Sequence, residues 1–319
     1  MMSAPSMQSR VEDYLDDRRR LGFSLKTTGS YLMSLARYAD RTGHSGPLSS
    51  EIILAWAQNE TASDKPTTWA KRLASIRRFL NYCAQTDGES NVPDSDVFGR
   101  PRGRPTPHIY TETEIADLLA AANRLPEPGT LRPATYETFF GLLAATGLRL
   151  SEALHLRCAD VDLIASQVTV RQAKWGKSRL VPLHPTVCEA MSRYQALRQR
   201  VPSGPDSHFF VSESGAAISR SVPQKVFKRL RADLGWVSRG SCPAPRIHDL
   251  RHSFICRRVM LWHEHGTDID NAMLALSTYV GHVAVTYTYW YLTGVPELMA
   301  IVGQKFEQFA SEAEEASND

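Results

Sequence analysis

The feature that most constrains the fold is a break in the hydrophobic pattern between residues 88 and 107. Across this segment the apolar periodicity disappears, and prolines and glycines alternate with arginines in FGRPRGRPTPH, residues 98–108. Proline and glycine at this density end helices and strands, so the segment predicts an extended linker. A chain of 319 residues is also long for one compact unit. We therefore predict two domains, residues 1–97 and 109–319, joined by a linker at residues 98–108.

The first predicted domain has the spacing of amphipathic helices. Between residues 8 and 87, apolar side chains recur every three or four positions, which is the period of a helix with one buried face. In the helix predicted at about residues 67–85, an apolar stripe lies opposite Lys71 and Arg78. A solvated surface is the ordinary explanation of such a basic face. Phosphate binding is the alternative, with Lys71 and Arg78 as candidate DNA contacts.

The linker itself is basic. Its arginines stand at every second position: Arg100, Arg102 and Arg104. An extended basic chain can follow a DNA backbone or enter a minor groove as it passes between two domains. The same composition also suits a linker that only keeps the chain solvated. Both interpretations stay open from the sequence, and the three arginines are candidate DNA contacts.

The second predicted domain combines helices with a short stretch of β-strand pattern. Thr111 followed three residues later by Glu114 is typical of a capped helix start, and helical spacing returns at about residues 133–145 and 186–200. Between residues 167 and 183 the period changes to two, with a basic turn between two short strands. The pattern predicts a mainly α-helical fold with one small β-hairpin.

Composition and cysteine spacing exclude several classes of protein. The five cysteines are widely spaced and form no CxxC pair, which argues against a disulfide framework and a zinc site. The longest apolar run, residues 139–148, is about half of the ~20 residues that a membrane-spanning helix needs. The N-terminus has no segment of the signal-peptide kind. We expect a cytoplasmic protein that uses no metal and no cofactor.

The net charge of +3 hides an uneven distribution of charged residues. Residues 307–319 carry five acidic and no basic side chains, so residues 1–306 carry a net charge of +8. A basic body suits a phosphate-rich partner, although many proteins of this charge bind none. The acidic tail is interpreted either as part of a docking segment or as a disordered end.

Several short motifs supply residue types that can act on a phosphate. They are an arginine with a carboxylate three residues later, a lysine on the hairpin turn, an HxxR box, and a Gly-His step followed by a tyrosine: Arg149 and Glu152, Lys174, His248 and Arg251, His282 and Tyr291. Each motif alone has an ordinary explanation. An HxxR box is by default a surface ion pair, and a carboxylate such as Glu152 is common at a helix start.

Two further patterns near these motifs need a choice between alternatives. His248 and His252 have the four-residue spacing of metal ligands, but no glutamate stands between them as in a metal-binding HExxH helix. Four tyrosines crowd residues 279–291, and they are either core aromatics or a source of one nucleophile. A tyrosine phenol titrates near pH ~10, so a reactive one needs cationic neighbours.

In this combination and order, the motifs resemble those of the tyrosine recombinase (integrase) family, and the resemblance covers nearly the whole chain. The phrase TYWYLTGVPELM, residues 288–299, looks like the integrases carried by transposons and multi-recombinase elements. The resemblance implies a two-domain, C-shaped DNA clamp. Its first domain would be a helical, SAM-like core-binding domain and its second a tyrosine recombinase catalytic domain.

Position by position, the resemblance implies a role for each motif residue. Tyr291 matches the nucleophile, because only this tyrosine has the family's spacing from the Gly-His step. Lys174 matches the hairpin lysine, although Trp175 stands where the family usually has glycine, and Lys177 is the alternative. The implied catalytic set is two arginines, two histidines, a lysine, the tyrosine and a supporting carboxylate: Arg149, Arg251, His248, His282, Lys174, Tyr291 and Glu152. Two basic neighbours on the hairpin are candidate DNA contacts: Lys177 and Arg179.

The resemblance also implies an activity and partners. The expected reaction is site-specific cutting and rejoining of double-stranded DNA through a 3′-phosphotyrosyl intermediate, without metal or ATP, for integration or transposition of a mobile element. The expected assembly is a homotetramer on two DNA sites, with other recombinases of the same element as further partners. Two other functions share the motifs. One is a catalytically silent DNA-binding accessory subunit, and the other is a type IB topoisomerase-like strand relaxer.

Overall fold

The computed structural model describes residues 6–61, 63–99, 106–126, 130–171, 178–201, 204–238 and 244–294, apart from the side chains of residue 270 and residues 291–294. The chain divides into two compact units, Met1–Arg104 and Pro105–Asp319. The division lies within residues 98–108, the segment that the sequence predicts as a linker. Each unit is built around a hydrophobic core of its own.

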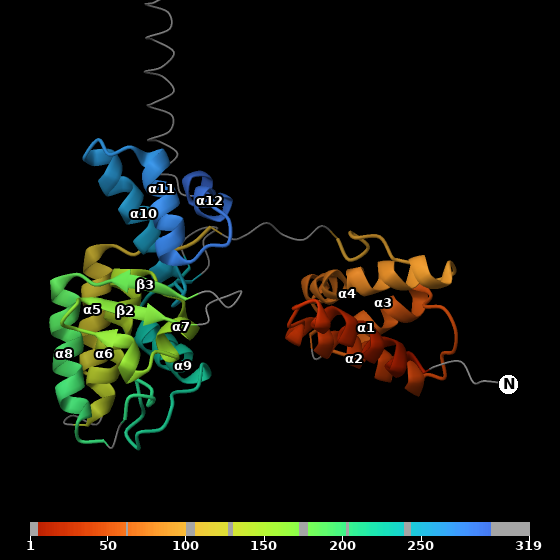
Figure 1. The fold of residues 1–319 in the computed structure, drawn as a ribbon, viewed down its shortest axis with the longest axis horizontal. Coiled ribbons are helices and arrows are strands. Elements are labelled where there is room, and N and C mark those ends of the chain that lie inside the picture. The colour runs from red at the N-terminus through yellow and green to blue at the C-terminus, as the bar shows by residue number, and fades with distance from the viewer. Residues whose placement is uncertain are drawn as a thin grey trace, which may run out of the picture. The chain divides into compact units, whose positions relative to one another are not determined.

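The first unit is helical over its described residues (Figure 1). Its helices are α1 (Met7–Arg20), α2 (Lys26–Arg41), α3 (Ser50–Asn59) and α4 (Pro66–Asp87). Ser49 caps α3, because its hydroxyl accepts a hydrogen bond from the Ile52 amide. Pro66 stands in the first turn of α4, where a helix needs no amide donor, and Gly88 ends the helix with a φ of 68°.

Helix α4 has one buried and one exposed face. Lys71 and Arg78 are exposed, whereas Arg72 is buried, with its guanidinium 4.3 Å from the centroid of the Trp56 ring. Arg72 also donates hydrogen bonds to the carbonyls of Trp56 and Glu60 at the end of α3. Arg72 therefore holds α3 against α4. Of these three cations, only Lys71 and Arg78 are available to a partner.

The second unit combines helices with a small antiparallel sheet (Figure 1). Its helices are α5 (Glu112–Asn123), α6 (Leu131–Thr146), α7 (Leu150–Leu154), the 3-10 helix η1 (Cys158–Asp160), α8 (Pro185–Arg198), α9 (Ser221–Asp233), α10 (Asp249–Glu264), α11 (Ile269–Val280) and α12 (Thr286–Gly294). Its strands are β1 (Val161–Asp162), β2 (Gln167–Val170) and β3 (Arg179–Pro182), in the order β1-β2-β3. The mainly helical fold with a small sheet is confirmed. The two-residue strand β1 is an addition to the predicted hairpin, and it pairs with β2.

Helix α6 lies at the centre of this unit. It contacts α5, α8 and α10 and is buried almost all round, because its aromatic and aliphatic side chains occupy every face. Neighbouring α5 begins at the predicted capping box. The Thr111 hydroxyl accepts a hydrogen bond from the Glu114 amide, and the Glu114 carboxylate accepts one from the Thr111 amide. Among the described residues, no helix is both long enough and apolar enough to cross a membrane.

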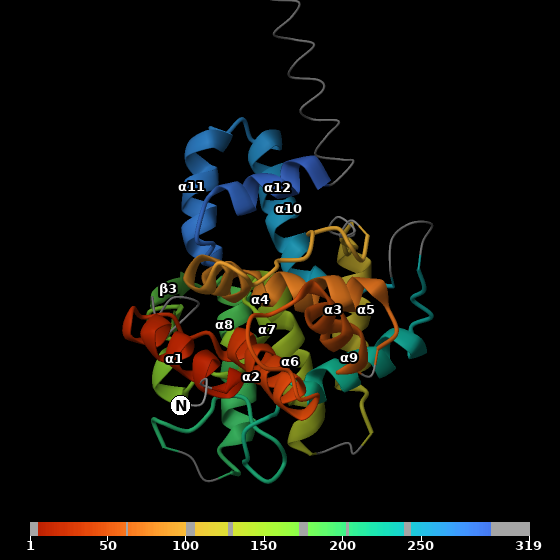
Figure 2. The same cartoon turned by 90° about the vertical axis from the view of Figure 1, so that its right-hand side faces the viewer.

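Helices α10, α11 and α12 form a separate hydrophobic cluster at one end of the second unit (Figure 2). Buried side chains of α10 and α11 make its centre, among them Ile255 and Met273, and Tyr289 and Trp290 of α12 pack against it. This cluster fixes the ends of the three helices close to the end of α6. These three helices and the links at their ends carry the motif residues that follow the hairpin in the sequence: His248, Arg251, His282 and Tyr291.

Candidate active site

The candidate site begins where α6 ends at the Thr146-Gly147 turn. Gly147 has a φ of 62°, and a Cβ added to it would lie 2.6 Å from the ring of Phe254 in α10. Glycine is therefore required twice here, by the left-handed backbone and by the close approach of α10. Arg149 follows this turn as the residue before α7. The turn thus brings Arg149 to the side of α10 that carries Arg251.

Glu152 joins two of the arginines. Its carboxylate accepts hydrogen bonds from Arg149 Nη1 at 2.7 Å and Arg179 Nη2 at 2.9 Å, and another from the Arg149 amide at 3.0 Å. Only 7% of its side chain is exposed. Burial alone would raise the pKa of this carboxyl, but the hydrogen bonds and charges of Arg179 and Arg149 lower it below its ordinary value. Glu152 is therefore an ionised anchor for both guanidinium groups.

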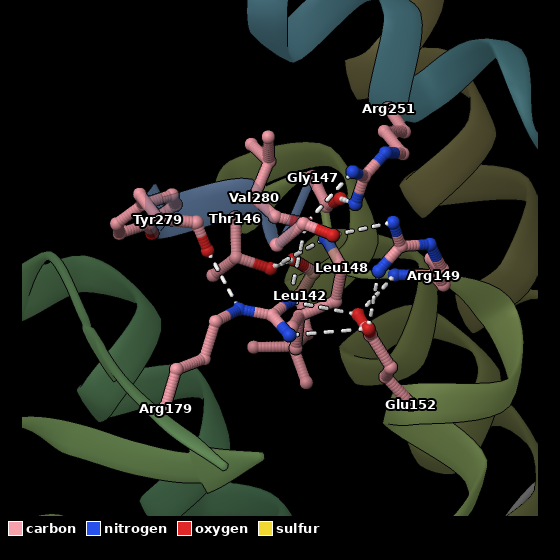
Figure 3. Close-up of polar contacts among 11 residues, drawn as sticks. Leu142, Thr146, Gly147, Leu148, Arg149, Glu152, Arg179, Arg251, Tyr279 and Val280 are labelled. Carbon is pink, nitrogen blue, oxygen red and sulfur yellow. Dashed lines mark hydrogen bonds and ion pairs between the residues drawn. The ribbon is translucent and has the colours of Figure 1, made fainter. Parts of the chain in front are cut away.

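Three arginines bind the carbonyl groups at the end of α11, as Figure 3 shows. The pairs are Arg179 Nε with the Tyr279 carbonyl at 2.8 Å, Arg251 Nη2 with the Val280 carbonyl at 2.7 Å, and Arg149 Nη2 with the Gly281 carbonyl at 2.7 Å. The last carbonyls of a helix lack partners within it and carry the negative end of its dipole. The guanidinium groups donate hydrogen bonds to these carbonyls, and the same contacts fix the orientation of each guanidinium group.

The HxxR pair lies at the start of α10. Arg251 is buried, and its Nη1 donates to the Gly147 carbonyl at 2.6 Å, so Arg251 bridges the ends of α6 and α11. His248 precedes the helix, and its ring packs on that of His252 with centroids 4.8 Å apart. Burial, followed by the charge of Arg251, lowers the pKa of His248 below its ordinary value. Its imidazole is therefore neutral near pH 7 and has a nitrogen able to accept a proton.

His282 lies in the link between α11 and α12. Its Nδ1 is 2.7 Å from the hydroxyl oxygen of Thr288, a fully buried residue of α12. Burial, with the charges of Arg251 and Arg149, lowers the pKa of His282 to about 3, so this ring is also neutral near pH 7. When the Thr288 hydroxyl donates to Nδ1, the ring proton is on Nε2, which can then donate a hydrogen bond.

The four tyrosines of residues 279–291 have different surroundings. Burial raises the pKa of Tyr279 to about 12, and its hydroxyl donates to the Pro182 carbonyl at 3.2 Å. Tyr289 packs against the cluster of α10 and α11, and Tyr287 is 49% exposed. The backbone of Tyr291 belongs to α12, whereas its side chain lies outside the described part of the chain. Tyr279 and Tyr289 are thus packing residues.

Several other predicted site residues are placed apart from this cluster or are not described. Five lie outside the described residues: Lys174, Lys177, Arg100, Arg102 and Arg104. Lys71 and Arg78 belong to the first unit. Arg179, predicted as a DNA contact, lies within the site with 11% of its side chain exposed. Among the residues that the structure describes, no three His, Cys, Asp or Glu side chains are grouped as a metal site.

A polar hollow of about 770 Å³ borders the site. Arg149 and Glu152 line one part of it, and His155, Arg171 and His208 line another. A second hollow of about 780 Å³, between α5, α6 and α8, is mainly apolar and contains none of the predicted catalytic residues. Arg157, Asp160 and Asp206 also line the polar hollow, so its three arginines are balanced by three carboxylates.

Sequence reasoning did not identify two features of this site. One is Thr288 as the partner of His282, and the other is the binding of three arginines to main-chain carbonyls. A signal for Thr288 exists, because it stands three residues before Tyr291 and therefore shares a face of α12 with it. The sequence cannot predict the carbonyl contacts, because every residue has a main-chain carbonyl. Only the tertiary fold determines which carbonyls lie next to an arginine.

Comparison with known proteins is consistent with this geometry. The sequence pattern of the phage integrase family matches residues 109–294. The putative integrase/recombinase y4rB of Sinorhizobium fredii is 36% identical over 310 residues, which cover 95% of this chain and 98% of that protein. The chain therefore belongs to the phage integrase family and is a tyrosine-type site-specific DNA recombinase. The resemblance predicted from the motifs is confirmed.

Solved structures share the fold. The Tn1549 transposon integrase in complex with transposon right-end DNA superposes with a TM-score of 0.68 at 17% identity, covering 96% of this chain and all (100%) of that one. A lambda integrase tetramer bound to a Holliday junction gives a TM-score of 0.59 at 17% identity, covering 89% and 79% of the two chains. At this level of identity the two structures establish the fold and do not assign individual residues.

Proposed function

We propose that this protein cuts and rejoins DNA by transesterification, with Tyr291 as the nucleophile. The observation that carries the proposal is the placement of Arg149 and Arg251, whose guanidinium groups bind the adjacent carbonyls of Gly281 and Val280 at 2.7 Å each. Two guanidinium groups held this close together suit the non-bridging oxygens of one phosphate, because each can donate planar pairs of hydrogen bonds.

The charge of the site also supports the proposal. Three guanidinium groups and one carboxylate carry a net charge of +2, contributed by Arg149, Arg179, Arg251 and Glu152. A phosphodiester under attack by an oxygen nucleophile passes from one negative charge toward two. A fixed and partly buried positive site stabilises the more highly charged transition state more than it stabilises the bound DNA. The arrangement therefore favours the chemical step over tight binding.

Proton transfers are assigned to the remaining residues. His248, kept neutral by burial, takes the proton of the Tyr291 hydroxyl as this oxygen attacks phosphorus, and His282 donates a hydrogen bond to the phosphate. Lys174 gives a proton to the departing 5′-oxygen. The DNA 3′-phosphate is then esterified to Tyr291, and a 5′-hydroxyl of a second strand can attack it in the reverse sense. One ester replaces another at each step, so neither metal nor ATP is needed.

The proposed substrates are two double-stranded DNA sites, joined by a homotetramer. The lambda integrase tetramer on a Holliday junction supports this assembly, and the Tn1549 integrase on transposon DNA supports integration or transposition of a mobile element. Other recombinases of the same element are proposed as further partners. We also propose the linker arginines and the exposed face of α4 as DNA contacts: Arg100, Arg102, Arg104, Lys71 and Arg78. Lys177 is proposed as a DNA contact of the hairpin.

A suicide substrate tests the proposal. A nicked duplex that carries the element's end sequence should give a covalent protein–DNA adduct with the wild type and none with Tyr291→Phe. An adduct that persists in Tyr291→Phe would contradict the assignment of the nucleophile. Absence of an adduct in the wild type on the correct site would favour the accessory subunit. On a supercoiled plasmid that carries two copies of the site, relaxed circles without recombinant products would favour the topoisomerase-like enzyme.

A further inference from the structure

Arg179 is placed unlike a residue that binds DNA from the surface. It opens strand β3, and in the sequence it is one more basic residue near the hairpin turn. In the structure its side chain points toward Glu152 and the end of α11 (Figure 3), and only 11% of it is exposed. So little exposed area leaves a DNA backbone few of its donors to contact.

The Arg179 guanidinium has two sets of partners. On one side Nη1 and Nη2 donate to the two carboxylate oxygens of Glu152 at 3.2 and 2.9 Å, the paired geometry that makes arginine–carboxylate contacts strong. On the other side Nε donates to the Tyr279 carbonyl at 2.8 Å and Nη2 to the Val280 carbonyl at 3.3 Å. One planar group therefore joins the turn end of the hairpin to α7 and to the end of α11.

Gly281 leaves the space that this guanidinium occupies. A Cβ added to Gly281 would lie 2.7 Å from Arg179 Nη1 and 2.8 Å from its Cζ, closer than side chains approach one another. The residue also has a φ of 71°, which favours glycine. The glycine before His282 is thus needed for the approach of Arg179 as well as for the turn itself.

Strand β3 and α11 are joined a second time. The Tyr279 hydroxyl donates to the Pro182 carbonyl at the far end of the strand, at 3.2 Å, while the Tyr279 carbonyl accepts from Arg179 at the near end. The position of the α11 end relative to the hairpin is therefore defined at two points. His282 follows this helix end by two residues, so its position depends on both contacts.

We infer that Arg179 is a positioning residue of the strand-transfer reaction and does not serve as a DNA contact. It acts through Glu152 on Arg149 and through the end of α11 on His282. The inference rests on the proposed function. A lysine cannot take over this role, because one ammonium cannot donate to a carboxylate in pairs and to two carbonyls on the opposite side. The charge of Arg179 alone is thus insufficient.

Arg179→Lys and Arg179→Gln test the inference in the full chain with the suicide substrate. We expect the rate of adduct formation at saturating DNA to fall by about 10- to 100-fold in both variants, the range that misplacement of catalytic groups produces. The Kd for DNA should stay within about twofold of wild type, with an unchanged salt dependence. Arg229→Gln is the matched control, since this exposed arginine of α9 pairs only at 3.9 Å with Asp233, and it should behave as wild type.

Weaker DNA binding with an unchanged rate of adduct formation would overturn the inference. A DNA contact predicts weaker binding in Arg179→Gln, a salt slope reduced by about one, and a normal rate at saturating DNA. Normal rates in both variants would also overturn it. Arg179→Gln can impair folding, because it leaves the buried Glu152 carboxylate without one of its two cations. A double variant, Arg179→Gln with Glu152→Gln, removes this carboxylate charge and provides a second test. Because the contacts of Arg179 with the α11 carbonyls do not involve Glu152, the double variant should lose less relative to Glu152→Gln than Arg179→Gln loses relative to wild type. A further loss equal to that of Arg179→Gln would contradict the route through Glu152.

Failure of the proposed function would look different. In that case the wild type itself would give no adduct. The pairing of Arg179 with Glu152 would then be decided by urea unfolding of the wild type, the two single glutamine variants and the double variant. Energetic coupling between the two residues supports the contact on which the inference depends, and additive effects on the unfolding midpoint overturn it.

Discussion

The two units hold their basic residues in different ways. On α4 of the first unit, Lys71 and Arg78 are exposed. In the second unit, three arginines donate to main-chain carbonyls, and the first two also pair with Glu152: Arg149, Arg179 and Arg251. The first pair can move toward any phosphate that approaches. The second group is held in fixed directions before a substrate arrives. The same residue types are therefore expected to control different quantities in the two units.

The difference separates affinity from rate. Exposed cations bind a DNA backbone by charge, release counterions and tolerate small displacements, so they contribute to affinity and to its salt dependence. Guanidinium groups fixed by buried partners lose little entropy and need little reorganisation when the phosphate becomes more negative, so they contribute to the rate. Exchanging arginine for lysine distinguishes the two, because the charge is kept and the directional donors are lost.

The largest effect is expected from Arg251→Lys. Arg251 donates to both the Gly147 and Val280 carbonyls, and a lysine cannot do so and also contact the phosphate. The rate of adduct formation should fall on the order of 10²- to 10³-fold, with little change in DNA affinity. Arg78→Lys, the matched exchange on α4, should change neither quantity. Equal effects of the two exchanges on the rate would break the proposed distinction.

Gly281→Ala should have the next largest effect. The new Cβ would lie within 3 Å of the Arg179 guanidinium, so the arginine or the α11 end must shift, and the rate should fall about 10- to 100-fold. Gly266→Ala is the control, because Gly266 has a similar φ of 65° but nothing within 4 Å. If both variants lose the same activity in the adduct assay, backbone strain is the cause and the contact is not.

Thr288→Val should reduce the rate by about five- to tenfold, the range expected when one hydrogen bond of ~1 kcal/mol is lost. Valine keeps the buried volume and removes the hydroxyl that lies 2.7 Å from His282 Nδ1, so the contact no longer selects one tautomer of the ring. Thr278→Val is the control, since the Thr278 hydroxyl bonds only a carbonyl of its own helix, that of Leu274. Single-turnover cleavage measures both, and equal rates for the two would show that Thr288 does not orient His282.

Lys71→Ala with Arg78→Ala should change affinity alone. Each neutralised phosphate contact contributes about 0.9 to the slope of log K against log salt, so the slope should fall by nearly two and the Kd should rise several-fold at moderate salt. The rate at saturating DNA should equal that of wild type. Fluorescence anisotropy over a salt series measures the slope, and an unchanged slope would remove α4 from the DNA interface.

A smaller effect is expected on stability as the pH falls. Burial lowers the pKa of His252 and that of His282 to about 3, with His248 and nearby arginines adding to the effect on His252 and arginines adding to the effect on His282. Both residues titrate near ~6.5 in an unfolded chain. Between these values the unfolded state binds protons that the folded state excludes, so stability is full above pH ~6.5 and falls below it. Urea midpoints from pH 7.5 to 5 measure this, and His252→Asn should make the decline shallower.

The motifs predicted the chemistry of the site better than its construction. The structure brings Arg149, Glu152, His248, Arg251 and His282 close together. Their meeting around one phosphate stays a proposal. Arg179 shows the limit of this reasoning. A basic residue near a hairpin turn has the same appearance in the sequence whether it is exposed or buried, and only the packing of α11 against β3 makes the difference.

The same limit applies to the helices. The capping box at Thr111 is a local signal and was sufficient to predict where α5 begins. The segment at residues 262–271 forms the end of α10, a short turn and the start of α11. Its role in placing the α11 end depends on contacts with β3, far away in the sequence, which no local pattern contains.

The most direct test of the account is to map the protein–DNA bond itself. The wild-type protein is trapped on a suicide substrate, the DNA is trimmed with nuclease, and the modified peptide is sequenced by mass spectrometry. We predict a single phosphotyrosyl residue at Tyr291, on the helix that carries Thr288. A modified Tyr287 or Tyr289, or a trapped complex with no covalent bond, would contradict it.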